Sequence, residues 1–170
     1  MELTLEKNTT RLRWHLKYAA YLIRHKYYVL VECVRLGVPF LGLVHDLSKF
    51  TPSEWFPYVE SFSKNSIYKD LLNTSVRSFD YAWNFHQKRN KHHPEFWVLG
   101  KGRYRKCLPI PDRYRREMLA DWVGANRAKN NGKNKILSWY AKNKSILELH
   151  SETRNWIESE LAKNYGETCG

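Results

Sequence analysis

Apolar residues recur at intervals of three and four along most of the chain, the spacing that places side chains on one face of an α-helix. The pattern breaks where residues that end helices occur: Gly37 and Pro39 follow the first long segment, and NNGKN interrupts a later one. The pattern predicts helices over about 9–36, 40–49, 73–90, 112–129, 134–143 and 146–164, and one more that begins near residue 52. The expected fold class is therefore all-α.

Two stretches refine this picture. In TPSE, Thr51 is expected to cap a helix, Pro52 takes its first position, and Glu54 completes a capping box. Residues 91–109 contain Pro and Gly and lack helical spacing, and WVLGKGRYRKCL within them favours a small hairpin over about 97–108. Because no repeat or low-complexity tract occurs, we expect a single domain over 1–170, with a core over about 10–130 and C-terminal helices over about 134–165.

Composition narrows the class of protein. Of the 170 residues, 42% are apolar, enough for a packed core. No run of eighteen apolar residues occurs and the N-terminal stretch lacks a signal-peptide pattern, so no membrane partner is expected. The odd number of cysteines, without metal-type spacing, indicates reduced thiols in a cytoplasmic protein: Cys33, Cys107 and Cys169. The net charge of +12 favours anionic partners such as nucleotides, nucleic acid or other phosphorylated ligands.

The stretch VHDLSKF places an imidazole, a carboxylate and an ammonium inside an apolar segment expected to be helical. Five histidines and two aspartates follow one another in a suggestive order: His25, His45, Asp46, His86, His92, His93 and Asp121. Imidazole and carboxylate together suit divalent Mn, Fe, Co, Ni or Zn. We expect one ion to be held by His25, His45, Asp46 and Asp121, and Asp46 to bridge to a second ion, held by His86 and by either His92 or His93.

Each of these residues also has a simpler interpretation. His25 lies on an apolar face, where a core histidine is common, and His45–Asp46 would form a hydrogen-bonded pair within a helix. Asp121 would form an ion pair with Arg116 or Arg127. His92 and His93 would lie in an exposed loop, and the remaining two histidines, His15 and His150, are expected at the surface or its boundary.

Basic residues near the proposed ligands are candidates for contacts with substrate phosphate. Lys49 lies one turn after Asp46, so it can reach the same place, although a lysine at a helix C-terminus is also favoured by the helix dipole. The other candidates are Arg89, Arg113 and Arg116. The basic stretch 101–106, which contains Tyr104, would alternatively contact a nucleic-acid backbone.

The order H…HD…H…H…D, with a lysine three residues after the HD aspartate, resembles the HD superfamily. The resemblance implies an all-helical fold, one or two metal ions, and a phosphohydrolase acting on a nucleotide or another phosphorylated small molecule, in which Asp46 and Lys49 serve the chemistry. A smaller branch of that superfamily implies a di-iron oxygenase instead, and HHPE is similar to the HHE of members that act on cyclic dinucleotides, although their GYP is missing. The motifs HDLSKF, HHPEFW and REMLADW also resemble a small uncharacterised family of phage and bacterial proteins over about 15–130, which implies a bacterial cell or phage-infected host. A basic, non-enzymatic nucleic-acid-binding protein is the hypothesis from another class, and no feature of the sequence indicates the oligomeric state.

Overall fold

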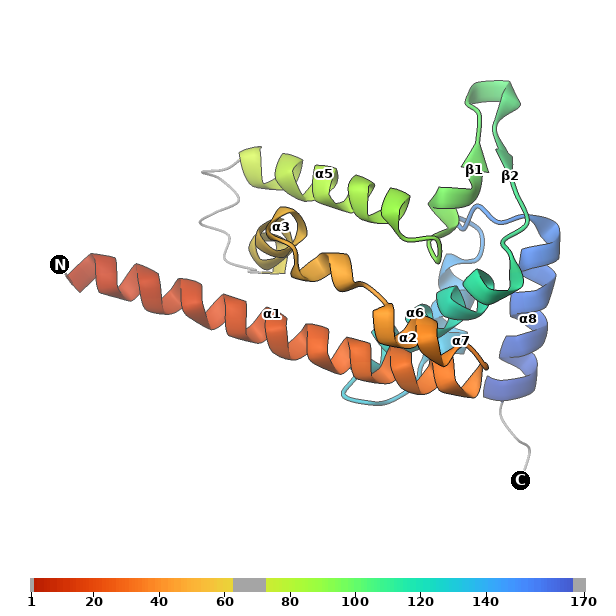
Figure 1. Ribbon diagram of the computed structural model, residues 1–170, viewed down its shortest axis with the longest axis horizontal. Helices are drawn as coiled ribbons and strands as arrows, with labels where there is room; N and C mark the ends of the chain where they lie inside the picture. Colours follow the sequence, from red (N-terminus) through yellow and green to blue (C-terminus); the bar gives the residue numbers. More distant parts are fainter. Residues whose placement is uncertain (1, 63–72, 167–170) are drawn as a thin grey trace. The chain divides into compact units, whose positions relative to one another are not determined.

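The computed structural model describes residues 2–62 and 73–166, and it confirms the all-α class (Figure 1). Its elements, with η for 3₁₀ helices, are α1 (Glu2–Arg35), α2 (Pro39–Val44), η1 (Leu47–Phe50), α3 (Pro52–Phe62), α5 (Asn73–Arg89), η2 (Pro94–Trp97), β1 (Val98–Leu99), η3 (Gly102–Tyr104), β2 (Lys106–Cys107), α6 (Asp112–Lys129), α7 (Ile136–Asn143) and α8 (Ser151–Tyr165). Among the described residues, no helix combines the length and the apolar character needed to cross a bilayer.

The packing divides the chain into two compact units. The first unit comprises Met1–Arg24 and Asp46–His86, and the second comprises His25–His45 and Gln87–Gly170. Helices α1 and α5 therefore contribute to both units. The expectation of a single domain stays a prediction.

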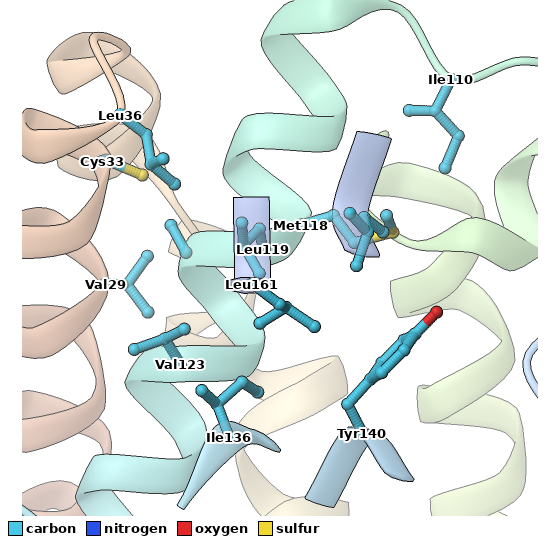
Figure 2. Packing of buried hydrophobic residues seen from close by; sticks show 12 residues of the cluster. Val29, Cys33, Leu36, Ile110, Met118, Leu119, Val123, Ile136, Tyr140 and Leu161 are labelled. Carbon is cyan, nitrogen blue, oxygen red and sulfur yellow. The ribbon is translucent and has the colours of Figure 1, made fainter. Parts of the chain in front are cut away.

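The core of the second unit lies between α1, α6, α7 and α8 (Figure 2). Its buried members are mainly aliphatic: Val29, Cys33, Leu36, Ile110, Met118, Leu119, Ala120, Val123, Ile136, Tyr140, Ile157 and Leu161. Burial raises the pKa of the Cys33 thiol to about 12, so this cysteine is a neutral core residue. Cys33 and Cys107 are free thiols, as predicted, whereas Cys169 lies outside the described residues.

A glycine sets how closely α6 approaches α1 within the second unit. A Cβ atom on Gly124 would lie 2.5 Å from Val29 Cγ2 and 2.8 Å from the Val29 backbone nitrogen. No larger side chain fits there unless the two helices separate. His25 and Asp121 lie one turn before Val29 and Gly124 on their respective helices, so the glycine contact brings these two polar residues within reach of each other.

The first unit has a smaller, aromatic core. Tyr18 and Leu22 of α1 pack with Val59 of α3, and aromatic side chains surround them: Trp14, Trp55 and Tyr58. The Trp55 indole donates a hydrogen bond to His15 Nδ1 over 2.9 Å, so His15 is a partly buried packing residue of this unit.

Several predicted elements are confirmed and some boundaries are wrong. The hairpin exists, with Val98 opposite Cys107 in an antiparallel pair. The first helix begins at Glu2 rather than near residue 9, and the last begins at Ser151 rather than 146, because the His150 side chain caps it by accepting a hydrogen bond from the Glu152 amide.

The predicted helix over 40–49 is wrong in its second half. Helix α2 ends at Val44, His45 leaves the helical conformation with ψ 129°, and Asp46 adopts φ 55°, the left-handed conformation. The 3₁₀ helix η1 then starts at Leu47. His45 and Asp46 therefore do not share a helix, and the polar pair forms the break between two helical segments.

Candidate metal centre

Three histidines of the second unit converge on one aspartate. Asp121 Oδ1 lies 3.2 Å from His25 Nε2 and 3.4 Å from His45 Nε2, and its Oδ2 lies 3.9 Å from His92 Nε2. The three histidines are at most 2% exposed, and the Asp121 side chain retains 15% exposure. His25, His45 and Asp121, three of the candidate ligands, therefore lie together in the second unit.

Glu117, one turn before Asp121 on α6, holds two of these imidazoles from the other side. Its Oε1 lies 3.1 Å from His45 Nδ1 and 3.2 Å from His92 Nδ1. A carboxylate at Nδ1 favours the N–H at that nitrogen, so with an ion bound beside Asp121 the Nε2 lone pair would be the one available to it. Glu117 therefore orients His45 and His92 in the way that metal-binding histidines are oriented.

The spacing of the donor atoms fits a first-row ion. His25 Nε2 and His45 Nε2 lie 3.3 Å apart, and both are 3.2–3.4 Å from Asp121 Oδ1. Ligands about 2.1 Å from a tetrahedral ion are about 3.4 Å from one another. The cluster is therefore able to hold a metal ion, and His45, His92 and Glu117 form another buried group of this kind.

The electrostatics of the cluster keep both carboxylates ionised. Burial raises the pKa of Asp121, but hydrogen bonds with His25 and His45 outweigh burial and hold this pKa well below its usual value. Burial likewise raises the pKa of Glu117, and the hydrogen bonds with His45 and His92 bring it below its usual value. Ionised carboxylates are the form that binds metals.

Local backbone structure positions the histidines. The Lys26 ammonium donates a hydrogen bond to the His45 carbonyl, which fixes the residue at the end of α2. Helix α5 ends at Arg89, as predicted, and the His93 amide donates to the Asn90 carbonyl over 3.1 Å in the turn that follows. This turn places His92 in the cluster. The His93 ring lies 4.4 Å from the His92 ring at a tilt of 41°, and His93 Nδ1 lies 3.9 Å from Glu95 Oε2.

The first unit carries a second buried cluster. His86 Nε2 lies 3.2 Å from Asp46 Oδ1, and His86 Nδ1 lies 2.8 Å from Glu54 Oε2. Lys49 Nζ lies 2.6 Å from Asp46 Oδ2, and Ser48 Oγ donates to Glu54 Oε2 over 3.1 Å. Here too a histidine has one carboxylate at Nδ1 and another opposite its Nε2.

Glu54 has a different role from the one its position suggested. It is fully buried and contacts His86 and Ser48, and the Thr51 amide, which a capping box would direct to Glu54, donates to the Ser48 carbonyl. Burial lowers the pKa of His86, but hydrogen bonds with Asp46 and Glu54 outweigh burial and raise it. Glu54 and His86 form a buried carboxylate–histidine pair through Nδ1, as Glu117 and His45 do.

The basic candidates have structural partners or are exposed. Arg116 donates to Asp112 over 2.6 Å and to the Leu36 carbonyl over 3.1 Å. Arg113 is exposed and stacks on the Tyr114 ring at 4.6 Å, and Arg89 is exposed. Of the four basic candidates, Lys49 is the one whose side chain lies in a buried cluster, that of the first unit.

The structure contradicts two of the simpler interpretations. Arg127 pairs with Glu32 at 3.3 Å and Arg116 with Asp112, so neither arginine is the partner of Asp121. His92 and His93 are 2% and 8% exposed, so they do not form an exposed loop. His150 caps α8, consistent with its expected boundary position.

The sequence interpretation gave no orienting role to two carboxylates. Glu117 precedes Asp121 by four residues, a spacing that places both on one face of a helix, and this is the signal that identifies it. Glu54 has no comparable signal, because its distance from His86 in the chain is 32 residues.

Comparison with known proteins gives a match at the level of a family. One family profile matches residues 14–163, and it describes a family of unknown function (DUF5662). No curated protein and no solved structure matches the chain.

Proposed function

The chain belongs to DUF5662, and we propose that it is a metal-dependent phosphohydrolase acting on a nucleotide or another phosphorylated small molecule. The observation that carries this proposal is the convergence of His25, His45 and His92 on Asp121 in the second unit. Two of these imidazoles, His25 and His45, form with the Asp121 carboxylate a donor set for a divalent first-row ion. The HD-like order of these residues in the sequence supports the same activity.

The proposed division of labour follows from the contacts. A divalent ion at such a site polarises a phosphoryl oxygen and lowers the pKa of a coordinated water toward about 7. His25, His45 and Asp121 would hold it, and Glu117 would keep His45 in the required tautomer while also holding His92 beside the ion. The 15% exposure of Asp121 leaves one edge of this set open to solvent.

The first-unit cluster by itself would hold an ion and carries a cation suited to a phosphorylated ligand. His86 Nε2 and Asp46 Oδ1, 3.2 Å apart, have the spacing of two ligands of one ion, and Glu54 would orient His86. The Lys49 ammonium, 15% exposed, would balance negative charge that develops on the phosphoryl group.

Elemental analysis tests the metal proposal. After purification with supplemented Mn, Fe, Co or Zn, the wild type should carry up to two ions per chain, and Asp121→Asn should lose at least one. Asp112→Asn is the matched control, because it makes the same change at an exposed position on the same helix. Wild type without any transition metal after supplementation, or equal metal in all three proteins, would refute the proposal.

Hydrolysis assays test the reaction class. The metal-loaded protein should release inorganic phosphate from nucleotides or aryl phosphates, and both His86→Ala and Asp46→Ala should lose this activity. An iron-loaded protein that consumes oxygen and leaves every phosphoester intact would favour the oxygenase instead. Salt-sensitive nucleic-acid binding that survives Asp46→Ala, with no hydrolysis, would favour the binding protein.

A further inference from the structure

Two tyrosines of the first unit have buried hydroxyl groups that the proposed chemistry does not use. Tyr18 of α1 is 2% exposed, and the hydroxyl oxygens of Tyr18 and Tyr58 are both buried. Among the residues that the structure describes, neither hydroxyl has a hydrogen-bond partner. A buried hydroxyl without a partner is destabilising, so two of them in one place indicate that something else receives their hydrogen bonds.

The two hydroxyls belong to one region of the unit. The Tyr18 and Tyr58 ring centroids lie 6.1 Å apart, and the Tyr58 ring also lies 6.1 Å from the His86 ring. Lys49 Nζ lies 5.5 Å from the centroid of the Tyr58 ring. Lys49, Asp46 and Glu54 interact electrostatically with both phenols.

The chemistry of this region is that of hydrogen-bond donors around a cation. Burial raises the pKa of both tyrosines, so both remain neutral and keep their O–H donors at ordinary pH. The nearby carboxylates already have partners, since Asp46 contacts Lys49 and Glu54 contacts His86. Two hydroxyl donors without a partner among the described residues therefore belong to the same region as the Lys49 ammonium, and donors of these kinds suit an oxyanion.

We propose that Tyr18, Tyr58 and Lys49 form an oxyanion-binding site that receives a phosphoryl group of the substrate. Each hydroxyl donates one hydrogen bond to a phosphoryl oxygen, and the Lys49 ammonium supplies the balancing charge. This site would be the part of the first unit that recognises the substrate. Its assignment to a phosphoryl group, and not to another anion, rests on the proposed function.

Inorganic phosphate is the probe, measured by calorimetric titration of the full chain after treatment with a chelator. Removing the metal separates this test from the metal proposal, which depends on elemental analysis of Asp121→Asn. Wild type should bind phosphate, and Tyr18→Phe and Tyr58→Phe should each weaken binding by about tenfold, the effect of losing one hydrogen bond to a charged group. The double variant should lose measurable binding.

Tyr81→Phe is the control, because Tyr81 is 60% exposed on α5 and should bind phosphate as the wild type does. The phenylalanine variants keep the ring packing, and thermal unfolding should show them to be at least as stable as the wild type, because no protein hydrogen bond among the described residues is lost. Failure of the metal-free wild type to bind phosphate, or binding by Tyr18→Phe and Tyr58→Phe at wild-type strength, would overturn the proposal even if the metal is confirmed.

Discussion

Buried histidines of both units are held by a carboxylate at Nδ1. Glu117 holds His45 and His92, and Glu54 holds His86. In each case Nε2 points toward a different carboxylate, Asp121 or Asp46. The orientation of an imidazole decides which nitrogen lone pair is available to a metal ion. These glutamates therefore determine how the histidines they hold can bind one.

Glu117→Gln tests this role. Glu117 Oε1 contacts both Nδ1 atoms, and the uncharged oxygen of an amide accepts hydrogen bonds more weakly than a carboxylate oxygen does. We expect metal affinity, measured by competition with a chromogenic chelator, to fall by about 10–100-fold. Glu152→Gln, at a side chain that is 65% exposed, should leave metal affinity unchanged, and an unchanged affinity in Glu117→Gln would contradict the role.

Helix α6 carries both carboxylates of the second-unit cluster and the glycine that brings it close to α1. Glu117, Asp121 and Gly124 follow at intervals of four and three, so all lie on the face toward the cluster and α1. The aspartate side chain is short, so α6 must lie close to α1 for Asp121 Oδ1 to come within 3.2 Å of His25 Nε2.

Gly124→Ala should separate these helices. Alanine is the better helix former by about 1 kcal/mol, but its Cβ would lie 2.5 Å from Val29 Cγ2, so overpacking should dominate. We expect a loss of about 1–3 kcal/mol in the free energy of unfolding, measured in urea, together with weaker metal binding. Ser138→Ala, at an exposed position of α7, should be neutral or slightly stabilising, and a stabilised Gly124→Ala would contradict the close approach.

The first turn of α6 provides a prediction about pH. The hydrogen bond from Arg116 lowers the pKa of the Asp112 carboxyl below its usual value, and Arg115 adds to the effect. Since the folded-state pKa is lowered, the stabilisation is present above about pH 4, the ordinary aspartate pKa, and is lost as the pH falls through the folded-state value.

Asp112→Asn should therefore destabilise the protein by about 0.5–1 kcal/mol at pH 7, a modest effect because the Asp112 side chain is 52% exposed. Urea unfolding at several pH values should show the difference from wild type shrinking below pH 4. A difference that stays constant down to pH 2.5 would contradict the ion-pair explanation.

At the scale of the whole molecule, the second-unit cluster connects segments that are far apart in the chain. His25 comes from α1, His45 from the end of α2, His92 from the turn after α5, and the carboxylates from α6. An ion bound by these segments stabilises the folded state alone, because the unfolded chain does not bring them together.

Adding the preferred metal should raise the melting temperature of the chelator-treated protein. At a free metal concentration of 100 times the dissociation constant, the gain is about 2.7 kcal/mol. Differential scanning calorimetry should show this shift in the wild type and its absence in His25→Ala. An equal shift in both proteins would show that the ion binds elsewhere.

Local pattern in the sequence was sufficient for much of the fold. Helical spacing and the Gly and Pro residues that interrupt it identified the helices from α1 to α8 in the described residues, and the hairpin at 97–108, because these features depend on neighbours in the chain. The boundary at Val44 was missed, since the left-handed conformation of Asp46 has no marker such as glycine.

The donor types of the candidate metal centre, and their order along the chain, follow from the sequence alone. The sequence identified His25, His45 and Asp121 as candidate metal ligands and Lys49 as a neighbour of Asp46, and these assignments depend on residue type, order and short spacing. The tertiary structure decided the rest: His92 in the second-unit cluster, Glu117 and Glu54 as the carboxylates that orient histidines, and Gly124 as the contact that brings α6 to α1. These choices depend on contacts between residues tens of positions apart, and such contacts arise only when the chain is packed.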